Sequence, residues 1–178
     1  MIWQCNHKYD GEEKCSTPHL TEDEIKVMFV SAANKLIGKK ATVIAPLRAS
    51  LGIAFDISAL EAEATELQED LMVASDLIQK CIYENAHVAL DQTEYQKRYD
   101  SLTARFDTAK ARLEEIEAVI ADKKSRRAEI EAFLDALAQA DLMEKFDAAL
   151  WCGLVDFVTV YDKDDVRFTF KNGQEIKS

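Results

Sequence analysis

Glycine and proline are scarce in this chain, which has five and two of them among 178 residues. Long flexible linkers are rich in such residues, so the composition excludes long linkers of that kind. Histidine occurs only three times, and the familiar catalytic patterns are missing. There is no Gly-rich phosphate loop, no Gly-x-Ser-x-Gly and no His-Glu-x-x-His. These absences argue against catalysis by this chain alone.

Long apolar runs are also missing from the sequence. No stretch of about 18 consecutive apolar residues occurs, so we expect no segment that spans a membrane. The first residues lack the basic region and the apolar core of a secretory signal. We therefore expect a cytoplasmic protein.

Positive charge is in deficit, with 22 basic and 33 acidic residues and a net charge of −11. Most of the deficit lies in residues 57–120, which hold 14 acidic and six basic side chains, whereas residues 1–56 hold seven of each. Residues 57–120 therefore repel phosphate, and any nucleic-acid contact is expected in the N-terminal part. The candidates for such a contact are Lys8, Lys14, Lys39 and Lys40.

What the sequence does contain is a heptad pattern in two runs. Apolar or small residues recur there in strict steps of four and three. The first run is Leu60, Ala64, Leu67, Leu71, Ala74, Ile78 and Cys81; the second is Tyr95, Tyr99, Leu102, Phe106, Ala109, Leu113, Ile116 and Ile120. This spacing is typical of a coiled-coil seam. Because neither seam can bury itself alone and the connector is short, we expect an antiparallel hairpin over residues 57–120.

Local signals predict the elements around the two runs. Capping boxes that begin at Thr21, Ser58 and Asp91 predict the starts of three helices. A further helix is expected from about 42 to 54, with Pro46 tolerable only near its first turn. The seam register continues beyond residue 120, so the second arm should re-enter the body, followed by a short helix over about 143–152.

The two ends of the chain have the alternation of β-strands. Residues 155–170 alternate around a turn at 162–165, which predicts a β-hairpin, and a last strand is expected near Ile176. At the N-terminus, the turn signal Asp10-Gly11 predicts a second hairpin, with residues 3–5 on one side and 14–15 on the other.

Four cysteines divide into two kinds by their surroundings. Cys81 falls on the seam and Cys152 lies among apolar residues, so both are expected to be small buried side chains. Cys5 and Cys15 lie in a polar, strand-like segment with two histidines nearby. That position in a cytoplasmic protein suggests a metal more than a disulfide.

Three interpretations of Cys5 and Cys15 are open. The two thiolates could form a tetrahedral zinc site with His7 and His19. They could be half of a zinc ribbon whose first Cys-x-x-Cys lies outside this chain. They could also be two reduced surface cysteines.

The connector between the two heptad runs is unusually apolar for an exposed turn. Its apolar and aromatic residues are Tyr83, Val88, Leu90 and Tyr95. These residues either cap the end of the hairpin locally or form a contact patch for another protein.

In the order of its segments, nearly the whole chain resembles the C-terminal third of the large serine recombinases, which are integrases of bacterial phages and transposons. The segments that carry the resemblance are Ile2-Trp-Gln-Cys5, Cys15-Ser-Thr-Pro-His-Leu-Thr-Glu-Asp-Glu24, Ala89-Leu-Asp-Gln-Thr-Glu-Tyr95 with Arg98-Tyr99, Phe146-Asp-Ala-Ala-Leu-Trp151, and residues 155–170 with Gly173.

The resemblance implies that Cys5 and Cys15 match the last two of the family's four zinc ligands, so zinc belongs to the full-length protein. The first two ligands, the catalytic serine domain and the recombinase DNA-binding domain have no counterpart in this sequence. In this family the zinc domain contacts attachment-site DNA. The coiled coil bridges recombinase subunits across the synapse, and it restrains synapsis in the wrong direction until a directionality factor binds.

We therefore expect a mainly α chain with a small β part. In it, a long antiparallel coiled-coil hairpin (57–120) projects from a compact α+β body of zinc-ribbon type, formed by residues 1–56 and 121–178. The expected function is that of a non-catalytic recombinase fragment with no membrane contact. The alternative is a stand-alone coiled-coil adaptor or regulator without a DNA role, and a metal-dependent enzyme is supported only by the Cys/His cluster.

Overall fold

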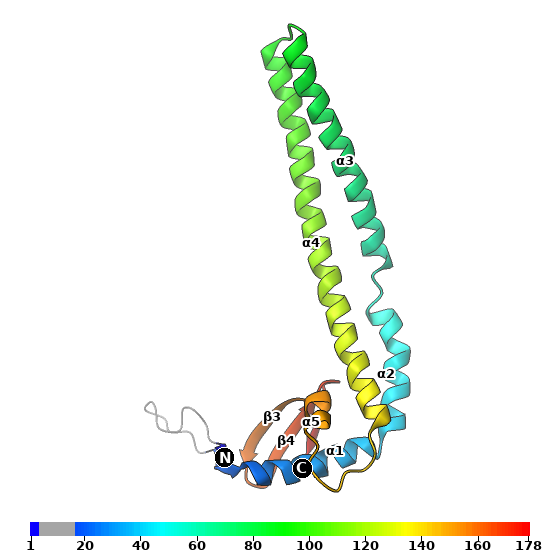
Figure 1. Cartoon of the computed structure of the whole chain (residues 1–178), viewed down its shortest axis with the longest axis vertical. Coiled ribbons are helices and arrows are strands. Elements are labelled where there is room, and N and C mark those ends of the chain that lie inside the picture. The colour runs from blue at the N-terminus through cyan, green and yellow to red at the C-terminus, as the bar shows by residue number, and fades with distance from the viewer. Residues whose placement is uncertain (4–16) are drawn as a thin grey trace, which may run out of the picture. The chain divides into compact units, whose positions relative to one another are not determined.

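The computed structural model describes residues 1–3 and 17–178, and most of these residues are helical (Figure 1). Five helices and two small antiparallel sheets are described, which confirms a mainly α chain with a small β part. The chain divides into two compact units. The first contains residues 1–54 and 127–178, and the second contains residues 55–126.

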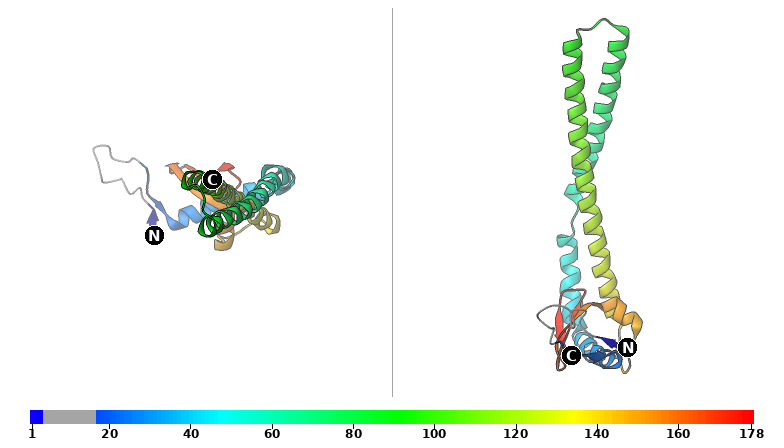
Figure 2. Two further views of the ribbon diagram at one scale, coloured as in Figure 1. Left: turned by 90° about the horizontal axis from the view of Figure 1, so that it is seen from above. Right: turned by 90° about the vertical axis from the view of Figure 1, so that its left-hand side faces the viewer.

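The second unit consists of α3 (Ser58–His87) and the first part of α4 (Gln92–Gln139). The two helices lie side by side in Figure 1 and in the right-hand view of Figure 2. Four ion pairs join them: Glu61–Lys124 (3.0 Å), Glu63–Arg112 (2.8 Å), Asp70–Arg105 and Glu84–Arg98 (2.9 Å). Residue numbers rise along one helix while they fall along the other, so α3 and α4 are antiparallel.

The predicted seam is the least exposed face of both helices. Every seam residue is buried or half-buried. Five are fully buried, namely Ala64, Ala74, Cys81, Ala109 and Ile116. The Asp70–Arg105 ion pair also places Leu71 at the level of Phe106.

The start of α3 differs in its chemistry from the prediction. Ser58 is the first helical residue, and Ile57 at the N-cap position makes no side-chain cap. The carboxylate of Asp56 accepts hydrogen bonds from the Ser58 N–H (2.9 Å) and hydroxyl (2.6 Å) instead. The predicted Ser58 capping box is therefore wrong, because an acceptor two residues earlier occupies the free N–H.

In the first unit, α1 (Glu22–Ile37) starts with the predicted capping box. Thr21 Oγ1 accepts from the Glu24 N–H (3.2 Å), and Glu24 Oε2 accepts from the Thr21 N–H (2.7 Å). Gly38 is the C-cap residue of this helix. The next helix, α2 (Lys40–Ala54), begins two residues earlier than predicted, so Pro46 lies in its second turn rather than its first.

The short helix α5 (Ala148–Leu154) begins later than predicted, with Asp147 as its N-cap. The reason is a long-range contact of the preceding segment. The Asn34 side chain donates to the Met143 carbonyl (2.9 Å) and accepts from the Met143 N–H (2.8 Å). These two bonds fasten the backbone at residue 143 to α1 and leave it outside any helix.

The sheets lie at the two ends of the described chain. β1 (Ile2–Trp3) pairs with β2 (Leu20–Thr21). The C-terminal sheet has the antiparallel order β3 (Val155–Asp162), β4 (Asp165–Phe170), β5 (Glu175–Lys177), which confirms the predicted hairpin and last strand. The turn before β5 contains Gly173 at φ 80°, a value that favours glycine. Residues 4–16, including the predicted turn at Asp10-Gly11, lie outside the described residues.

The core of the first unit is an aromatic cluster around Phe29 of α1. Its ring centroid lies 5.0 Å from Trp151, 5.7 Å from Phe146 and 6.1 Å from Phe168. These edge-to-face and tilted ring contacts join α1, α5 and the inner face of the sheet into one core.

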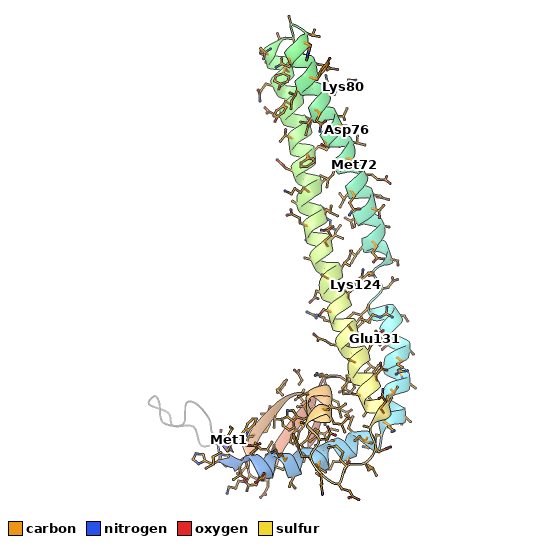
Figure 3. The ribbon with its side chains drawn as sticks, in the orientation of Figure 1. Met1, Met72, Asp76, Lys80, Lys124 and Glu131 are labelled. Carbon is orange, nitrogen blue, oxygen red and sulfur yellow. The ribbon has the colours of Figure 1, made fainter. Side chains whose placement is uncertain are left out.

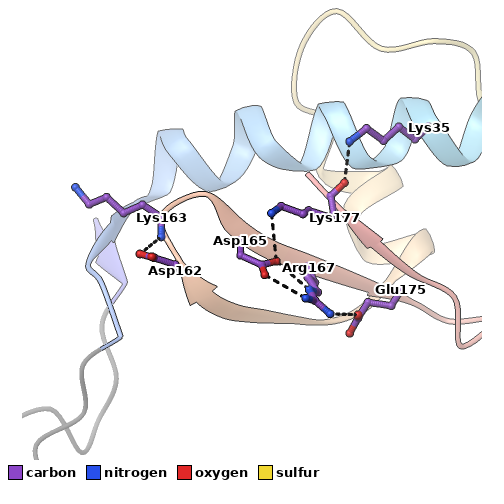
Figure 4. Close-up of polar contacts among 7 residues, drawn as sticks. All are labelled: Lys35, Asp162, Lys163, Asp165, Arg167, Glu175 and Lys177. Carbon is purple, nitrogen blue, oxygen red and sulfur yellow. Dashed lines mark hydrogen bonds and ion pairs between the residues drawn. The ribbon is translucent and has the colours of Figure 1, made fainter.

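The outer face of the same sheet carries charge (Figure 4). Arg167 bonds Asp165 (2.9 Å) and Glu175 (3.0 Å), and Lys177 lies 3.8 Å from Asp165. The Arg167 guanidinium lowers the pKa of the Asp165 carboxyl.

From the sequence we expect no segment that spans a membrane, but one segment of the structure is apolar enough to be a candidate. Within Lys40–His87, an 18-residue window has a mean hydropathy of 1.5, and 6% of that window is buried. By length and composition alone it could cross a membrane. Core helices of soluble proteins and signal sequences meet the same criterion, so this is weak evidence for a membrane span.

Candidate functional site

The short connector between α3 and α4 is built by caps on both sides. Val88 leaves the helix in an extended conformation, and its N–H donates to the Glu84 carbonyl (2.9 Å). Asp91 Oδ1 then accepts from the N–H groups of Thr93 (2.8 Å) and Glu94 (3.1 Å). Asp91 thus starts α4 as predicted, although no bond from the Glu94 carboxylate back to Asp91 completes a capping box among the described contacts.

Side chains also join the two sides of the connector. Gln92 Nε2 donates to Asn85 Oδ1 (3.0 Å) and to the Leu90 carbonyl (3.3 Å). One helical turn further, Arg98 and Glu84 form an ion pair at 2.9 Å. These polar contacts hold the connector in one conformation without using its apolar side chains.

Four apolar side chains at this end of the helix pair are exposed to solvent. They are Ile82 (47% exposed), Tyr83 (63%), Val88 (57%) and Leu90 (37%). We call these four residues the tip patch. Tyr95, which the sequence grouped with them, is half-buried in the seam, and its ring lies 6.0 Å from Tyr99.

Ile82 was missed by the sequence analysis. It lies one residue beyond the seam position Cys81, so a search along the seam register passes over it. The signal that could have found it is an apolar residue off the seam, within two helical turns of an apolar connector.

The orientation of Tyr83 is fixed from one side. The His87 ring stacks on the Tyr83 ring with centroids 4.1 Å apart and an interplanar angle of 26°. The His87 Nδ1 atom also lies 2.8 Å from the Tyr83 carbonyl oxygen, in hydrogen-bonding geometry. An aromatic ring that is ordered in advance loses less conformational entropy when a partner covers it.

The tip patch does not continue down the outer face of α3. Below it, that face carries Lys80 and Asp76 before the next exposed apolar residues, Val73 and Met72, of which Figure 3 labels Met72. Charged groups beside the patch pair with each other, as in Lys97–Glu94 (3.0 Å). The arrangement therefore offers a confined apolar surface that can be buried against a protein.

The predicted metal ligands Cys5 and Cys15 lie outside the described residues, as does His7. His19 is exposed. In residues 1–3 and 17–178, no group of three or more His, Cys, Asp or Glu side chains could hold a metal ion.

The predicted DNA-contact lysines have different surroundings. Lys8 and Lys14 lie outside the described residues, and Lys39 is exposed. The Lys40 ammonium donates hydrogen bonds to the carbonyls of Ala138 (3.2 Å) and Ala140 (2.7 Å), near the end of α4. Its charge offsets the helix dipole there, which is a structural role.

The two cysteines that were expected to be buried differ. Cys81 is buried, as predicted, but Cys152 is exposed, so that part of the prediction is wrong. Its neighbour Leu154 is fully buried and Trp151 joins the aromatic cluster, which leaves residue 152 on the outer side of α5.

No family model, curated protein or solved structure matches the chain in comparisons with all three.

Proposed function

We propose that this chain is a non-catalytic, C-terminal part of a site-specific serine recombinase. In this proposal α3 and α4 form a coiled coil whose tip patch contacts other recombinase subunits in synapsis and directionality control. The first unit assists binding to attachment-site DNA, with zinc held by Cys5 and Cys15 together with ligands outside this sequence. The basis of the family assignment is the sequence resemblance.

The coiled-coil interpretation is supported by the pattern of contacts. The heptad residues form the least exposed face of both helices, and three ion pairs repeat along one flank of it. Their acidic members are Glu63, Asp70 and Glu84, which are separated by multiples of seven residues. Charged pairs that flank an apolar seam with this period are typical of coiled coils.

The observation that carries the interaction function is the exposure of the tip patch. Each apolar side chain left in water forgoes roughly 25 cal/mol per Å² of buried contact. The capping contacts of the connector are made by backbone and polar groups, so local capping does not account for Val88 and Leu90. A protein partner that covers the patch accounts for them.

The charge distribution supports a division of labour between the two units. Residues 57–120 carry a net charge of −8, which opposes contact with DNA phosphates. DNA contact is therefore assigned to the N-terminal part of the first unit, residues 1–54, which hold seven basic and six acidic side chains and in which Lys39 is exposed.

The test of the tip patch is the double variant Val88→Glu/Leu90→Glu. Both side chains are exposed, so helicity and melting temperature should remain almost unchanged. In the full-length recombinase, complexes that join two attachment sites should weaken, while binding of one subunit to its own site persists. The matched control is Met72→Glu/Val73→Glu, which places two acidic groups at exposed apolar positions of the same helix outside the patch.

Normal synapsis by the tip variant would contradict the interaction function, and so would an equal loss in the control. The neighbouring gene sequence distinguishes the recombinase from the alternative function, a stand-alone adaptor. An upstream Cys-x-x-Cys and a resolvase-like serine domain in the same reading frame would support the recombinase. Their absence would favour the adaptor.

A further inference from the structure

The two flanks of the helix pair in the second unit are closed differently. One flank carries three ion pairs whose members directly precede positions of the seam register, namely Glu63–Arg112, Asp70–Arg105 and Glu84–Arg98. On the opposite flank, the residues directly follow the seam, and the described contacts there include one ion pair between the helices, Glu61–Lys124. We call this second side the open flank.

On α3, the open flank is uncharged from residue 65 to residue 86. Steps of seven residues from Glu61, together with the positions beside them on the same side, form one row: Thr65, Gln68, Met72, Ser75, Gln79, Ile82 and Ala86. Within this row, Met72 is 71% exposed and Ser75 is half-buried. The helix as a whole holds seven acidic residues and one basic residue, so the uncharged row stands out from the rest of its surface.

On α4, the open flank is acidic. Steps of seven residues back from Lys124 reach Glu117, Lys110, Thr103 and Gln96. Beside them, about one helical turn away, lies a row of three exposed acidic residues at intervals of seven, which are Asp100, Asp107 and Glu114. We call these three residues the acidic row.

The charges of the acidic row are only partly offset within the chain. Lys110 lies 3.9 Å from Glu114, and Asp100 accepts a hydrogen bond from the Gln96 amide (2.7 Å), which leaves its charge in place. With Glu117, the open flank of α4 between residues 96 and 117 holds four acidic residues and one basic residue, for a net charge of −3.

This arrangement favours a basic helix as the partner. A third helix on the open flank can place its uncharged side against the row on α3 and its basic residues against the acidic row on α4. Charged residues beside a seam select the partner in coiled coils. If a second copy packed its own α4 antiparallel against this α4, Asp107 would face Asp107 and Asp100 would face Glu114, and like charges in such positions oppose pairing.

We propose that the open flank binds an α-helix of another polypeptide and so completes a three-helix bundle. That helix has one uncharged or apolar stripe, with a Lys or Arg beside it at intervals of seven residues. Seven residues span about 10 Å of helix, so these basic residues match the spacing of the acidic row. The flexible thioether of Met72 supplies the main apolar contact, and the charge pairs select the partner.

The open flank meets the tip patch at Ile82 and is otherwise separate from it. The proposal does not depend on the recombinase assignment. Because synapsis by the recombinase alone is assigned to the tip patch, Met72→Glu/Val73→Glu remains a control for synapsis, although Met72→Glu should weaken binding of a helix to the open flank.

The probe is a capped peptide of three repeats of Ala-Ala-Gln-Leu-Lys-Ala-Gln, which places a lysine at every seventh residue. The matched control peptide has glutamate in place of each lysine. Binding is measured by nuclear magnetic resonance on the isotopically labelled chain at low salt. The basic peptide should shift the amide resonances of residues 65–86 and 96–117 and should bind about tenfold more tightly than the acidic one. The difference should shrink as salt is raised.

Two variants separate the acidic row from the general charge of the helix pair. Asp100→Asn/Asp107→Asn should lose most of the preference for the basic peptide, and Asp100→Lys/Asp107→Lys should prefer the acidic one. The matched control is Glu66→Gln/Glu69→Gln, which removes two exposed acidic groups of α3 outside the uncharged row and should keep the preference.

Equal binding of the two peptides by the unmodified chain would overturn the proposal, and so would an equal loss of preference in the control variant. Shifts confined to another surface would also overturn it. Concentration-dependent shifts of the same amides without any peptide would show that a second copy occupies the open flank instead.

Discussion

Truncation of Ile116 should destabilise the helix pair more than truncation of Leu71, although both occupy seam positions. Ile116 is 1% exposed, whereas Leu71 is half-buried. From the sequence alone, Leu71→Ala is expected to cost about 2–4 kcal/mol if that position is buried on both sides. The structure does not meet that condition, so the largest loss is assigned to Ile116.

The magnitude follows from the atoms removed. Either substitution deletes three carbon groups, and each buried group contributes about 0.8 kcal/mol. Ile116→Ala should therefore cost at least about 2.4 kcal/mol, and more where a cavity remains. Leu71→Ala should cost less than Ile116→Ala, because part of the Leu71 side chain remains in contact with water. Val119 on the same helix is 42% exposed, and Val119→Ala should cost below about 0.5 kcal/mol.

The assay is urea denaturation of the whole chain followed by circular dichroism. Hydrogen exchange of the amides in residues 58–87 assigns the loss to the helix pair, because α4 extends into both units. A loss for Leu71→Ala that equals or exceeds the loss for Ile116→Ala would refute the reasoning from burial. A loss of several kcal/mol for Val119→Ala would refute the assignment of the seam.

Three further predictions concern the first unit. Arg167 lowers the pKa of Asp165 below its ordinary value of 3.8, so this pair stabilises the fold above that pH and ceases to do so as the pH falls. Asp165→Asn should therefore flatten the acid side of a thermal stability profile. Asp147→Ala removes the N-cap of α5 and should cost about 1 kcal/mol, measured by denaturation against Asp147→Ser, which retains an acceptor. In the proposed zinc ribbon, Cys5 and Cys15 supply two of four ligands, so zinc should bind weakly or not at all to the isolated chain; a stoichiometric, chelator-resistant ion on elemental analysis would contradict this.

The seam could be predicted because it depends on local spacing alone. Steps of four and three place residues on one face of any α-helix, whatever the helix packs against. The starts of α1 and α4 were predictable for the same reason, since their capping groups lie within three residues of the helix start.

What failed depended on groups far apart in the sequence, or on competition between neighbours. The late start of α5 follows from hydrogen bonds to Asn34, more than 100 residues away. Ser58 lost its capping role to Asp56, which offers a stronger, charged acceptor. The hydrogen bonds from the Lys40 ammonium to the carbonyls of Ala138 and Ala140 likewise join residues about 100 positions apart. Spacing within a segment contains none of this information.

The tip patch could be predicted from the sequence only in part. The apolar character of the connector was visible in the sequence, and the structure leaves Tyr83, Val88 and Leu90 exposed. Tyr95 could not be separated from them by composition, because its place in the seam depends on where α4 begins. Its burial follows from the Asp91 cap, which puts residue 95 within the first turn of that helix.

The register of the helix pair has two determinants of different strength. The ion pairs on one flank repeat with a period of seven, so sliding one helix by a heptad could form pairs again, such as Asp70 with Arg112. These ion pairs alone therefore do not select one register of α3 against α4. The connector does, because α3 ends at His87 and α4 begins at Gln92, leaving four residues between them. A slip by one heptad would have to unwind helical turns beside the connector, and hydrogen bonds of the kind that Asp91 and Gln92 make would be lost. The polar contacts that leave the tip patch exposed are thus also the ones that fix how α3 and α4 pair.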